Sequence, residues 1–206
     1  MFAYKKYKRI LDLSIIIVAH VMPPFPIIWL FIWVVVPVAI WLEDKGPIFY
    51  TQTRIGKNGV LFKIYKFRTM IPNAELNGPV WASKTDPRIT KVGKILRLTA
   101  LDELPQILNI IKNDMSLVGP RAERPELHNQ FCEKIPEFKL RLSVKPGLTG
   151  TAQINGPYDL EPQEKLNFDL KYIQSISFIT DMAIIIKSII NTLTAKWDKP
   201  TKQNTK

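Results

Sequence analysis

The sequence predicts an α+β fold, mostly helical with one small β-hairpin, behind a broken apolar membrane helix. An uncharged apolar run extends from Leu13 to Leu42 and is interrupted by the proline-rich stretch Met22–Ile27. Two β-rich segments flank a turn at Lys57–Gly59, and apolar residues at helical spacing recur through much of the remaining chain. The length of 206 residues suits one domain with an added appendage.

The apolar run has the composition of a bilayer segment. It is longer than the apolar region of a signal peptide, and no small-x-small cleavage site precedes Glu43. A straight helix of its 30 residues would be about 45 Å long, against a hydrocarbon core of roughly 30 Å. Because the prolines of "MPPFPI" break such a helix, we expect each half to be too short to cross alone.

Basic residues on both sides of this run predict its topology. They are Lys5, Lys6, Lys8 and Arg9 before it, and Lys45, Arg54, Lys57, Lys63, Lys66 and Arg68 after it. The positive-inside rule places both flanks in the cytoplasm. This favours a re-entrant helix-break-helix that dips into one leaflet, with a kinked span as the alternative.

A second amphipathic segment lies near the other end, in "SFITDMAIIIKSIINTL". Its apolar residues at helical spacing are Met182, Ile185, Ile186, Ile189, Ile190 and Leu193, and Asp181, Lys187, Ser188 and Asn191 lie on or near the opposite side. By pattern alone such a helix packs in a core, but beside a membrane anchor we expect it at the interface. We therefore predict a membrane segment at 1–44, a domain at 45–196 that includes this helix, and a frayed polar tail at 197–206.

Composition restricts the classes of partner. The chain has 29 Lys and Arg against 18 Asp and Glu, which suits nucleic acid, an anionic membrane face or a phosphorylated substrate. The single Cys132 excludes an internal disulfide, and one cysteine with two histidines argues against a zinc site.

The predicted hairpin, "IFYTQTRIGKNGVLFKIYKFRTM", interleaves Lys63, Lys66 and Arg68 with aromatic residues. An ordinary solvated strand face is the plain alternative. The following stretch at 73–90 is rich in Pro, Gly, Asn and Asp, so we expect a loop near the site.

Two adjacent carboxylates, Asp102 and Glu103, stand out in "VGKILRLTALDELPQILNIIKN". This stretch predicts two helical pieces joined at Thr99–Asp102, because Pro105 is tolerated only in the first turn of the second piece. The carboxylates then lie at a helix N-terminus. Acidic residues there commonly serve the cap and the helix dipole, each contributing about 0.3–1 kcal/mol.

Two arginines suggest a different role for the pair. Arg97 precedes it by five residues, and the turn in "DMSLVGPR" presents Arg121. Guanidinium groups bind phosphate oxygens bidentately, and Mg²⁺ prefers carboxylate and phosphate oxygens, so these residues fit a phosphate ester beside a divalent cation. An ion-pair network is the alternative.

A glycine-rich stretch is a further candidate anion site. In "KPGLTGTAQINGP", backbone N–H groups near Gly147, Gly150 and Gly156 could hold an anion with the help of Lys145. The P-loop, the dinucleotide fingerprint and H-E-x-x-H are not found in the sequence.

The order of these blocks resembles that of the bacterial sugar transferases known as monotopic phosphoglycosyl transferases. A basic start and broken apolar segment, "FKIYKFRTM", "LDELPQ", "DMSLVGPR", "KPGLTGTAQINGP" and "FDLKYIQSISFITD" carry the resemblance over about Lys8 to Leu193. It implies transfer of a sugar 1-phosphate from a UDP-sugar to polyprenyl (undecaprenyl) phosphate, with release of UMP. This reaction initiates exopolysaccharide, lipopolysaccharide or glycoconjugate synthesis.

The resemblance also implies roles for individual residues. Asp102 matches the family's nucleophile and Glu103 its partner in the dyad that holds Mg²⁺. The implied substrate-binding residues are Lys66, Arg68, Arg97, Arg121, Lys145, Gln153 and Asp169. The chain departs from the family where it has Ala122 in place of the usual proline, Lys145 in place of a frequent arginine, and "PPFP" at the membrane break.

Partners and location follow from the same resemblance. It implies a monotopic protein in one leaflet, on the cytoplasmic face of the bacterial inner membrane. Expected partners are membrane lipid, a UDP-sugar, polyprenyl phosphate, a second copy of the chain and downstream glycosyltransferases, and no nucleic acid.

Two other classes of function stay open on the residues alone. A non-catalytic basic membrane adaptor would bind anionic lipid or nucleic acid, but it has no use for two carboxylates between arginines. A membrane glycosyltransferase or a lipid phosphatase would use similar substrates. The first would transfer sugar without phosphate, and the second would release free phosphate.

Overall fold

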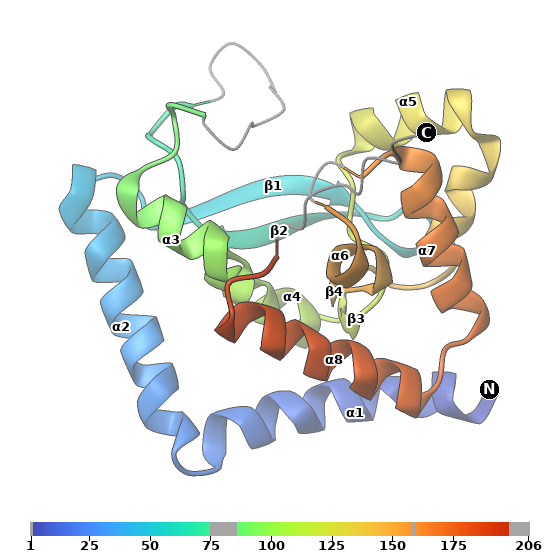
Figure 1. The fold of residues 1–206 in the computed structure, drawn as a ribbon, viewed down its shortest axis with the longest axis horizontal. Coiled ribbons are helices and arrows are strands. Elements are labelled where there is room, and N and C mark those ends of the chain that lie inside the picture. The colour runs from blue at the N-terminus through green and yellow to red at the C-terminus, as the bar shows by residue number, and fades with distance from the viewer. Residues whose placement is uncertain (1, 75–85, 158–159, 198–206) are drawn as a thin grey trace, which may run out of the picture.

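The computed structural model describes residues 2–74, 86–157 and 160–197 (Figure 1). The α-helices are α1 (Phe2–Val21), α2 (Phe25–Asp44), α3 (Lys91–Thr99), α4 (Ile107–Ile111), α5 (Pro125–Lys134), α6 (Thr151–Asn155), α7 (Pro162–Gln174) and α8 (Phe178–Leu193). The 3₁₀ helices are η1 (Lys57–Gly59), η2 (Leu101–Gln106) and η3 (Pro136–Ser143), and the strands are β1 (Phe49–Ile55), β2 (Leu61–Phe67), β3 (Ser116–Val118) and β4 (Gly147–Thr149). The predicted α+β class, mostly helical with a small hairpin, is confirmed.

The apolar run forms α1 and α2 with a break between them, as predicted (Figure 1). The expectation that each half is too short to cross a membrane is wrong for the second half. Within the described residues there is one helix that is long enough and apolar enough to cross a membrane, and it covers Pro26–Asp44. Pro26 lies in the first turn of α2, where no intrahelical N–H bond is lost, and the helix continues past Pro37 to Asp44.

Both ends of this helix pair contact the rest of the chain. Near the start of α1, Tyr4 Oη donates to Asp181 Oδ2 at 2.6 Å. In the middle of the same helix, the Asp12 carboxylate accepts a hydrogen bond from Ser116 Oγ at 2.6 Å. At the far end, Glu43 accepts hydrogen bonds from the backbone N–H groups of Lys91 at 2.7 Å and Val92 at 3.1 Å. The two helices therefore run along the left and lower edges of the molecule in Figure 1, and the ends distant from the break are docked on the same domain.

The predicted hairpin is confirmed. Strands β1 and β2 pair antiparallel around η1, in a register that runs from Phe49 opposite Phe67 to Ile55 opposite Leu61. The buried Asn109 side chain then joins the hairpin to α4, because its Nδ2 donates to Lys63 O at 2.7 Å and its Oδ1 accepts from Tyr65 N at 3.1 Å. The hairpin is thus fixed against the helical segment that follows the two carboxylates.

The helical break before the carboxylates is also as predicted. Helix α3 ends at Thr99, and Ala100 has a left-handed backbone with φ of 55°. The next piece begins as the 3₁₀ helix η2 and continues as α4. Asp102 and Glu103 lie in the first turn of η2, so their predicted position at a helix start is confirmed.

A short parallel pair, β3 and β4, lies beside α6 and α8 (Figure 1). Its strands are three residues long, and two glycines let the backbones meet. A Cβ on Gly147 would lie 2.0 Å from Gly119 N, a distance that real structures do not show. Glycine is therefore required at Gly147 for close backbone approach.

Helix α8 (Phe178–Leu193) buries polar side chains and exposes most of its apolar ones. Asp181 and Asn191 are buried at 1% and 5% exposure, whereas the apolar Ile186, Ile189 and Leu193 are 53%, 53% and 81% exposed. Most of its apolar stripe therefore lies outside the core, although Ile185 packs against the core cluster that contains the buried Ile184. Most of the expected loop at 73–90 and nearly all of the expected tail, at 75–85 and 198–206, lie outside the described residues.

Candidate active site

The carboxylate pair lies at the start of η2, beside β2 and the turn after β3. Glu103 is held by two cations: Lys66 Nζ lies 2.6 Å from Oε1, and Arg121 donates to Oε1 at 2.6 Å and to Oε2 at 3.1 Å. Asp102 is buried at 8% exposure and makes no hydrogen bond or ion pair within the described part of the chain. The N-cap of η2 is Ala100, with no side-chain hydrogen bond, so helix capping does not account for the pair.

The two carboxyl groups differ in electrostatic state. Burial raises the pKa of Asp102 above its ordinary value. The positive charge of Lys66 acts in the opposite direction, because it favours the ionised carboxylate, but burial outweighs it. Burial also acts to raise the pKa of Glu103, but the charges and hydrogen bonds of Arg121 and Lys66 outweigh it and hold that pKa well below the usual range. Glu103 is therefore held as an anion, and Asp102 is a buried carboxyl with no hydrogen-bond or ion-pair partner among the described residues.

Arg97 approaches the pair from α3. Its charge is among those that favour the ionised form of Asp102. Its Nε donates to Thr69 Oγ1 at 2.9 Å. The structure therefore brings together five residues that the sequence predicts for the site, namely Asp102, Glu103, Lys66, Arg97 and Arg121.

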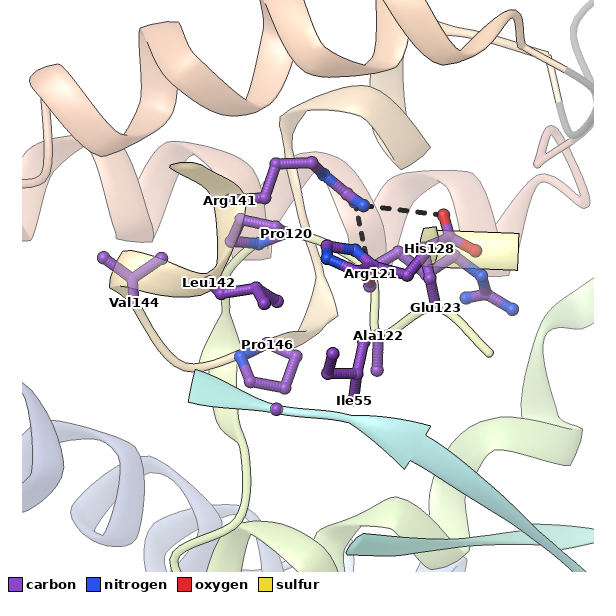
Figure 2. A pocket seen from close by; sticks show the side chains of 11 residues that line it. Ile55, Pro120, Arg121, Ala122, Glu123, His128, Arg141, Leu142, Val144 and Pro146 are labelled. Carbon is purple, nitrogen blue, oxygen red and sulfur yellow. Dashed lines mark hydrogen bonds and ion pairs between the residues drawn. The ribbon is translucent and has the colours of Figure 1, made fainter. Parts of the chain in front are cut away.

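A buried network of charges supports Arg121, and Figure 2 shows the two contacts that Arg141 makes in it, with Arg121 and with Glu123. Arg141 Nη2 donates to Arg121 O at 3.0 Å, and its Nη1 lies 3.7 Å from Glu123 Oε1. The same guanidinium donates from Nε to Asp169 at 2.6 Å, and Lys165 donates to Glu123 at 3.0 Å. Burial alone would raise the pKa of Glu123, but Lys165 and Arg141 lower it to about 2. This network fixes the backbone that carries Arg121.

Four predicted substrate-binding residues have other contacts. Arg68 pairs with Asp44 at the end of α2, through Nη1 and Oδ2 at 2.7 Å. Asp169 is buried and accepts a hydrogen bond from Arg141 Nε. Lys145 Nζ donates to Asn113, and Gln153 Nε2 donates to Leu148 O at 3.2 Å. The structure does not bring these four residues to the carboxylate pair.

The expectation that backbone N–H groups of the glycine-rich stretch are exposed to hold an anion is wrong for Gly147 and Gly156. Gly147 N donates to Pro120 O and Gly156 N donates to Ala152 O, both at 2.9 Å. These N–H groups are engaged in the fold. The physical reason is that Gly147 belongs to β4, and Gly156 follows the last turn of α6.

Several charged residues near the site were missed by the sequence analysis. Arg54 of β1 lies close to Arg121 and Glu103, donates to Ala122 O at 3.1 Å, and has its pKa lowered by burial. Glu123, Arg141 and Lys165 form the network behind Arg121. The charged Arg54 on a predicted strand was the one local sign that a further residue belongs to the site. The other three pair with residues distant in sequence, and such pairs leave no periodic pattern.

Positive charge dominates this region. The described cations whose charges act directly on Asp102 or Glu103 are Arg54, Lys66, Arg97 and Arg121. These four cations around the two carboxylates leave an excess of positive charge that an anionic substrate would offset. The site therefore suits a ligand that carries several negative charges.

The residues present fit a magnesium ion that also has substrate ligands. Groups of three or more His, Cys, Asp or Glu side chains that could hold a metal are not found within the described residues. Mg²⁺, however, is commonly bound by one or two carboxylates together with substrate phosphates and water. The carboxylate of Asp102, which has no described partner, and the adjacent Glu103 supply this minimal set.

The fold and the site define a class of protein: a small helical domain carried on a broken apolar helix pair, with a carboxylate pair surrounded by cations. The sequence profile of the family described as "Bacterial sugar transferase" matches residues 3–195. The chain belongs to this family, whose members are membrane-associated sugar transferases.

Individual relatives agree with the family assignment. The chain is 41% identical over 160 residues to the UDP-N-acetylgalactosamine-undecaprenyl-phosphate N-acetylgalactosaminephosphotransferase of Aeromonas hydrophila, covering 76% of this chain and 38% of the relative. It is 41% identical over 159 residues to the UDP-glucose:undecaprenyl-phosphate glucose-1-phosphate transferase of Escherichia coli (strain K12), covering 75% and 34%. It is 39% identical over 168 residues to the exopolysaccharide production protein PSS of Rhizobium leguminosarum bv. phaseoli, covering 77% and 84%. The aligned part therefore spans little more than a third of the first two relatives and most of the third.

Proposed function

We propose that the protein transfers a sugar 1-phosphate from a UDP-sugar to polyprenyl phosphate, which gives a polyprenyl diphosphate sugar and UMP. The observation that carries the proposal is the buried Asp102, which has no partner in the described part of the chain, beside Glu103, whose oxygens are held by Lys66 and Arg121. The printed names of two relatives differ in the sugar but share a UDP-sugar donor and undecaprenyl phosphate, which supports this substrate class.

The transfer proceeds in two steps. An oxygen of the Asp102 carboxylate attacks the β-phosphorus of the donor, and the bond from that phosphorus to the bridging oxygen breaks. The bridging oxygen leaves with the electron pair as part of UMP, and Asp102 carries the sugar phosphate as an acyl phosphate. An oxygen of polyprenyl phosphate then attacks the same phosphorus, and the Asp102 carboxylate is regenerated.

The contacts of the two carboxylates support this division of roles. Glu103 is already engaged by Lys66 and Arg121, so its oxygens are less available for attack. Asp102 has no such partner, and a buried carboxylate without hydrogen bonds is a stronger nucleophile than a solvated one. The charges of Arg97 and Arg121 favour the ionised form of Asp102 and can stabilise the charge on the transferred phosphate.

We further propose that Asp102 and Glu103 hold Mg²⁺ together with phosphate oxygens of the donor. When bound, the ion would neutralise phosphate charge and polarise the phosphorus. Lys66 and Arg121 keep Glu103 ionised and fix the position of its carboxylate.

We place the protein on the cytoplasmic face of the bacterial inner membrane, with α1 and α2 as a re-entrant pair in one leaflet. The contacts at both ends support this placement, because Tyr4 near one end and Glu43 at the other bind the same domain. A spanning arrangement would place these ends on opposite sides. The exposed apolar stripe of α8 supplies a second membrane contact, and the lipid-linked product would pass to downstream glycosyltransferases.

The decisive experiment follows the label of a UDP-sugar that carries phosphorus-32 at the β position. With polyprenyl phosphate present, we expect the label in the lipid fraction. Without the lipid, we expect UMP release up to one equivalent per protein and a sugar-phosphate mass adduct on Asp102. Asp102→Asn should abolish both the adduct and turnover while the thermal unfolding midpoint stays close to that of the wild type.

Other results would assign another function. UDP as the product indicates a glycosyltransferase, free labelled phosphate indicates a phosphatase, and no reaction with any UDP-sugar indicates an adaptor. Transfer that requires donor and lipid together, without an adduct, would retain the overall reaction but replace the covalent step with direct attack by the lipid phosphate.

A further inference from the structure

We propose that Thr69 is a positioning residue, which orients the Arg97 guanidinium so that its two terminal nitrogens face the phosphate of the donor. The inference rests on the proposed function and adds a residue that acts on the substrate only through Arg97.

Thr69 binds α3 at two places. Its carbonyl oxygen accepts a hydrogen bond from Thr90 N at 3.1 Å, at the N-cap of the helix. Its Oγ1 accepts from Arg97 Nε at 2.9 Å, two turns further along. Thr69 is itself buried at 7% exposure. One residue therefore fixes both the start of α3 and the side chain near its end.

Gly93 makes this contact possible. A Cβ at this position would lie 2.1 Å from Thr69 O and 2.7 Å from Thr69 C, so any larger residue would push the helix away. The Thr90 side chain also accepts from Gly93 N at 2.9 Å, which completes the first turn. The close approach of α3 to Thr69 is therefore built into the backbone, and the distance from Thr69 to Arg97 follows from it.

The hydrogen bond from Arg97 Nε to Thr69 decides which nitrogens of the guanidinium remain available for a substrate. A guanidinium offers five N–H donors in a plane, and the paired donors on Nη1 and Nη2 bind two phosphate oxygens at once. In the described part of the chain, Nη1 and Nη2 of Arg97 have no hydrogen bond or ion pair. With Nε on Thr69, the plane is fixed, and the terminal edge, which has no hydrogen-bond partner among the described residues, can bind a phosphate. The described carboxylate whose charge acts on Arg97 from α3's N-terminal side is Asp86, which is itself paired with Arg88. A long side chain held in advance also loses less conformational entropy on binding.

Four variants test the coupling by a double-mutant cycle. Thr69→Val keeps the size and branching of threonine but removes the acceptor, and Thr69→Ser keeps the acceptor. Arg97→Lys keeps a positive charge but has no Nε donor, and it is combined with Thr69→Val. The exposed Thr53 of β1 gives a matched control, Thr53→Val, for the loss of a hydroxyl elsewhere.

We expect Thr69→Val to lower kcat for UMP release about tenfold with little change in KM or in the unfolding midpoint, and Thr69→Ser to restore most of the rate. In the Arg97→Lys background, Thr69→Val should change kcat less than twofold, because the contact is already lost. An equal tenfold loss in both backgrounds, or no loss with Arg97 present, would overturn the proposal.

A measurement that needs no turnover separates this proposal from the proposed function. The Nε–H resonance of Arg97, assigned by its absence in Arg97→Lys, should exchange slowly with solvent in the wild type and in Thr53→Val, and faster in Thr69→Val. Unchanged exchange in Thr69→Val would contradict the orienting contact. Absence of UMP release from the wild type would contradict the proposed function alone, since the exchange result would still decide the role of Thr69.

Discussion

At the scale of single residues, the site depends on which cation holds which carboxylate. Arg121 places two nitrogens on Glu103, and Lys66 binds the same carboxylate, so Glu103 stays ionised despite its burial. Asp102, one residue earlier, feels the charges of these cations but makes no hydrogen bond to them. Adjacent residues on a helix project in different directions, so two neighbouring carboxylates can occupy different environments.

Arg121→Ala should therefore lower turnover by about 100-fold or more, because it removes a cation from the carboxylate pair and from the transferred phosphate. The Arg121 side chain is 26% exposed, so we expect the free energy of unfolding to change by only about 1–2 kcal/mol. Steady-state UMP release and chemical unfolding measure the two effects. Arg121→Lys, which keeps the charge but not the fork, is the control, and a variant that fails to fold would show that Arg121 is structural.

Glu123 should contribute to stability in a pH-dependent way. Its pKa of about 2 in the folded protein lies below the ordinary value of 4.5, so its stabilising effect is complete above about pH 5 and is lost as the pH falls toward 2. Glu123→Gln should lower the free energy of unfolding at pH 7, and the difference from wild type should shrink by about 2–3 kcal/mol between pH 6 and pH 3. Urea unfolding at several pH values measures this, with the exposed Glu133→Gln as control. A difference that does not change with pH would contradict the low pKa.

Individual residues show what the sequence could predict of the site. Asp102, Glu103 and Arg121 were predictable because a proline and a turn fix their places along the chain. Lys66 and Arg68 alternate along one predicted strand, which implies one face for both, but β2 ends at Phe67 and Arg68 turns to Asp44 instead. The pairing of Asp169 with Arg141 spans 28 residues, and no local pattern encodes it.

At the scale of elements, the two carboxylates that end α2 organise the domain next to them. Asp44 pairs with Arg68, the neighbour of Thr69, and Glu43 accepts two backbone N–H groups at the start of α3. These are N–H groups that a helix start leaves without intrahelical partners. The apolar helix therefore holds both the helix that carries Arg97 and the segment that orients it.

Glu43→Ala should consequently weaken the start of α3. Loss of the side-chain acceptor at a helix N-terminus costs about 0.5–2 kcal/mol, and we expect the free energy of unfolding to fall within that range. UMP release should fall less than in Arg121→Ala, because Arg97 keeps its contact with Thr69. Urea unfolding and initial rates measure the two effects. Glu126→Ala, also in a first turn, is the matched control, and an equal loss of stability there would mean that the Glu43 contact adds nothing specific.

The elements themselves were predictable where a strong local pattern sets them. The turn at Lys57–Gly59 specifies the hairpin, and Pro105 specifies the start of η2. The three-residue strands β3 and β4 are too short to leave a periodic pattern, and their pairing depends on close contact between Gly119 and Gly147. The length of α2 was underestimated because a proline in a first turn does not delay a helix.

At the scale of the whole molecule, charge and apolar surface are arranged as an anionic membrane would require. The chain carries a formal net charge of +11, and cations flank the apolar run on both sides. The exposed apolar residues of α1, α2 and α8 lie on helices that bound the lower and left parts of the molecule in Figure 1. A re-entrant pair in one leaflet would bury these helices and keep the carboxylate pair near the headgroups, where a soluble donor and a lipid acceptor can both reach it.

Topology gives the test of this arrangement. In a Cys132→Ser background, single cysteines are placed before Met1, at Asn58 in the hairpin turn and at Met22 in the helix break. If α1 and α2 are re-entrant, an impermeant thiol reagent should label the first and second cysteines only after the cells are opened, and should label Met22→Cys poorly because lipid surrounds it. If α2 instead spans the membrane, the cysteine before Met1 and that at Asn58 lie on opposite sides, and one of them will react in intact cells. That result would also require the contacts of Asp12 with Ser116 and of Glu43 with α3 to be broken in the membrane, because the domain that makes both contacts cannot lie on two sides at once.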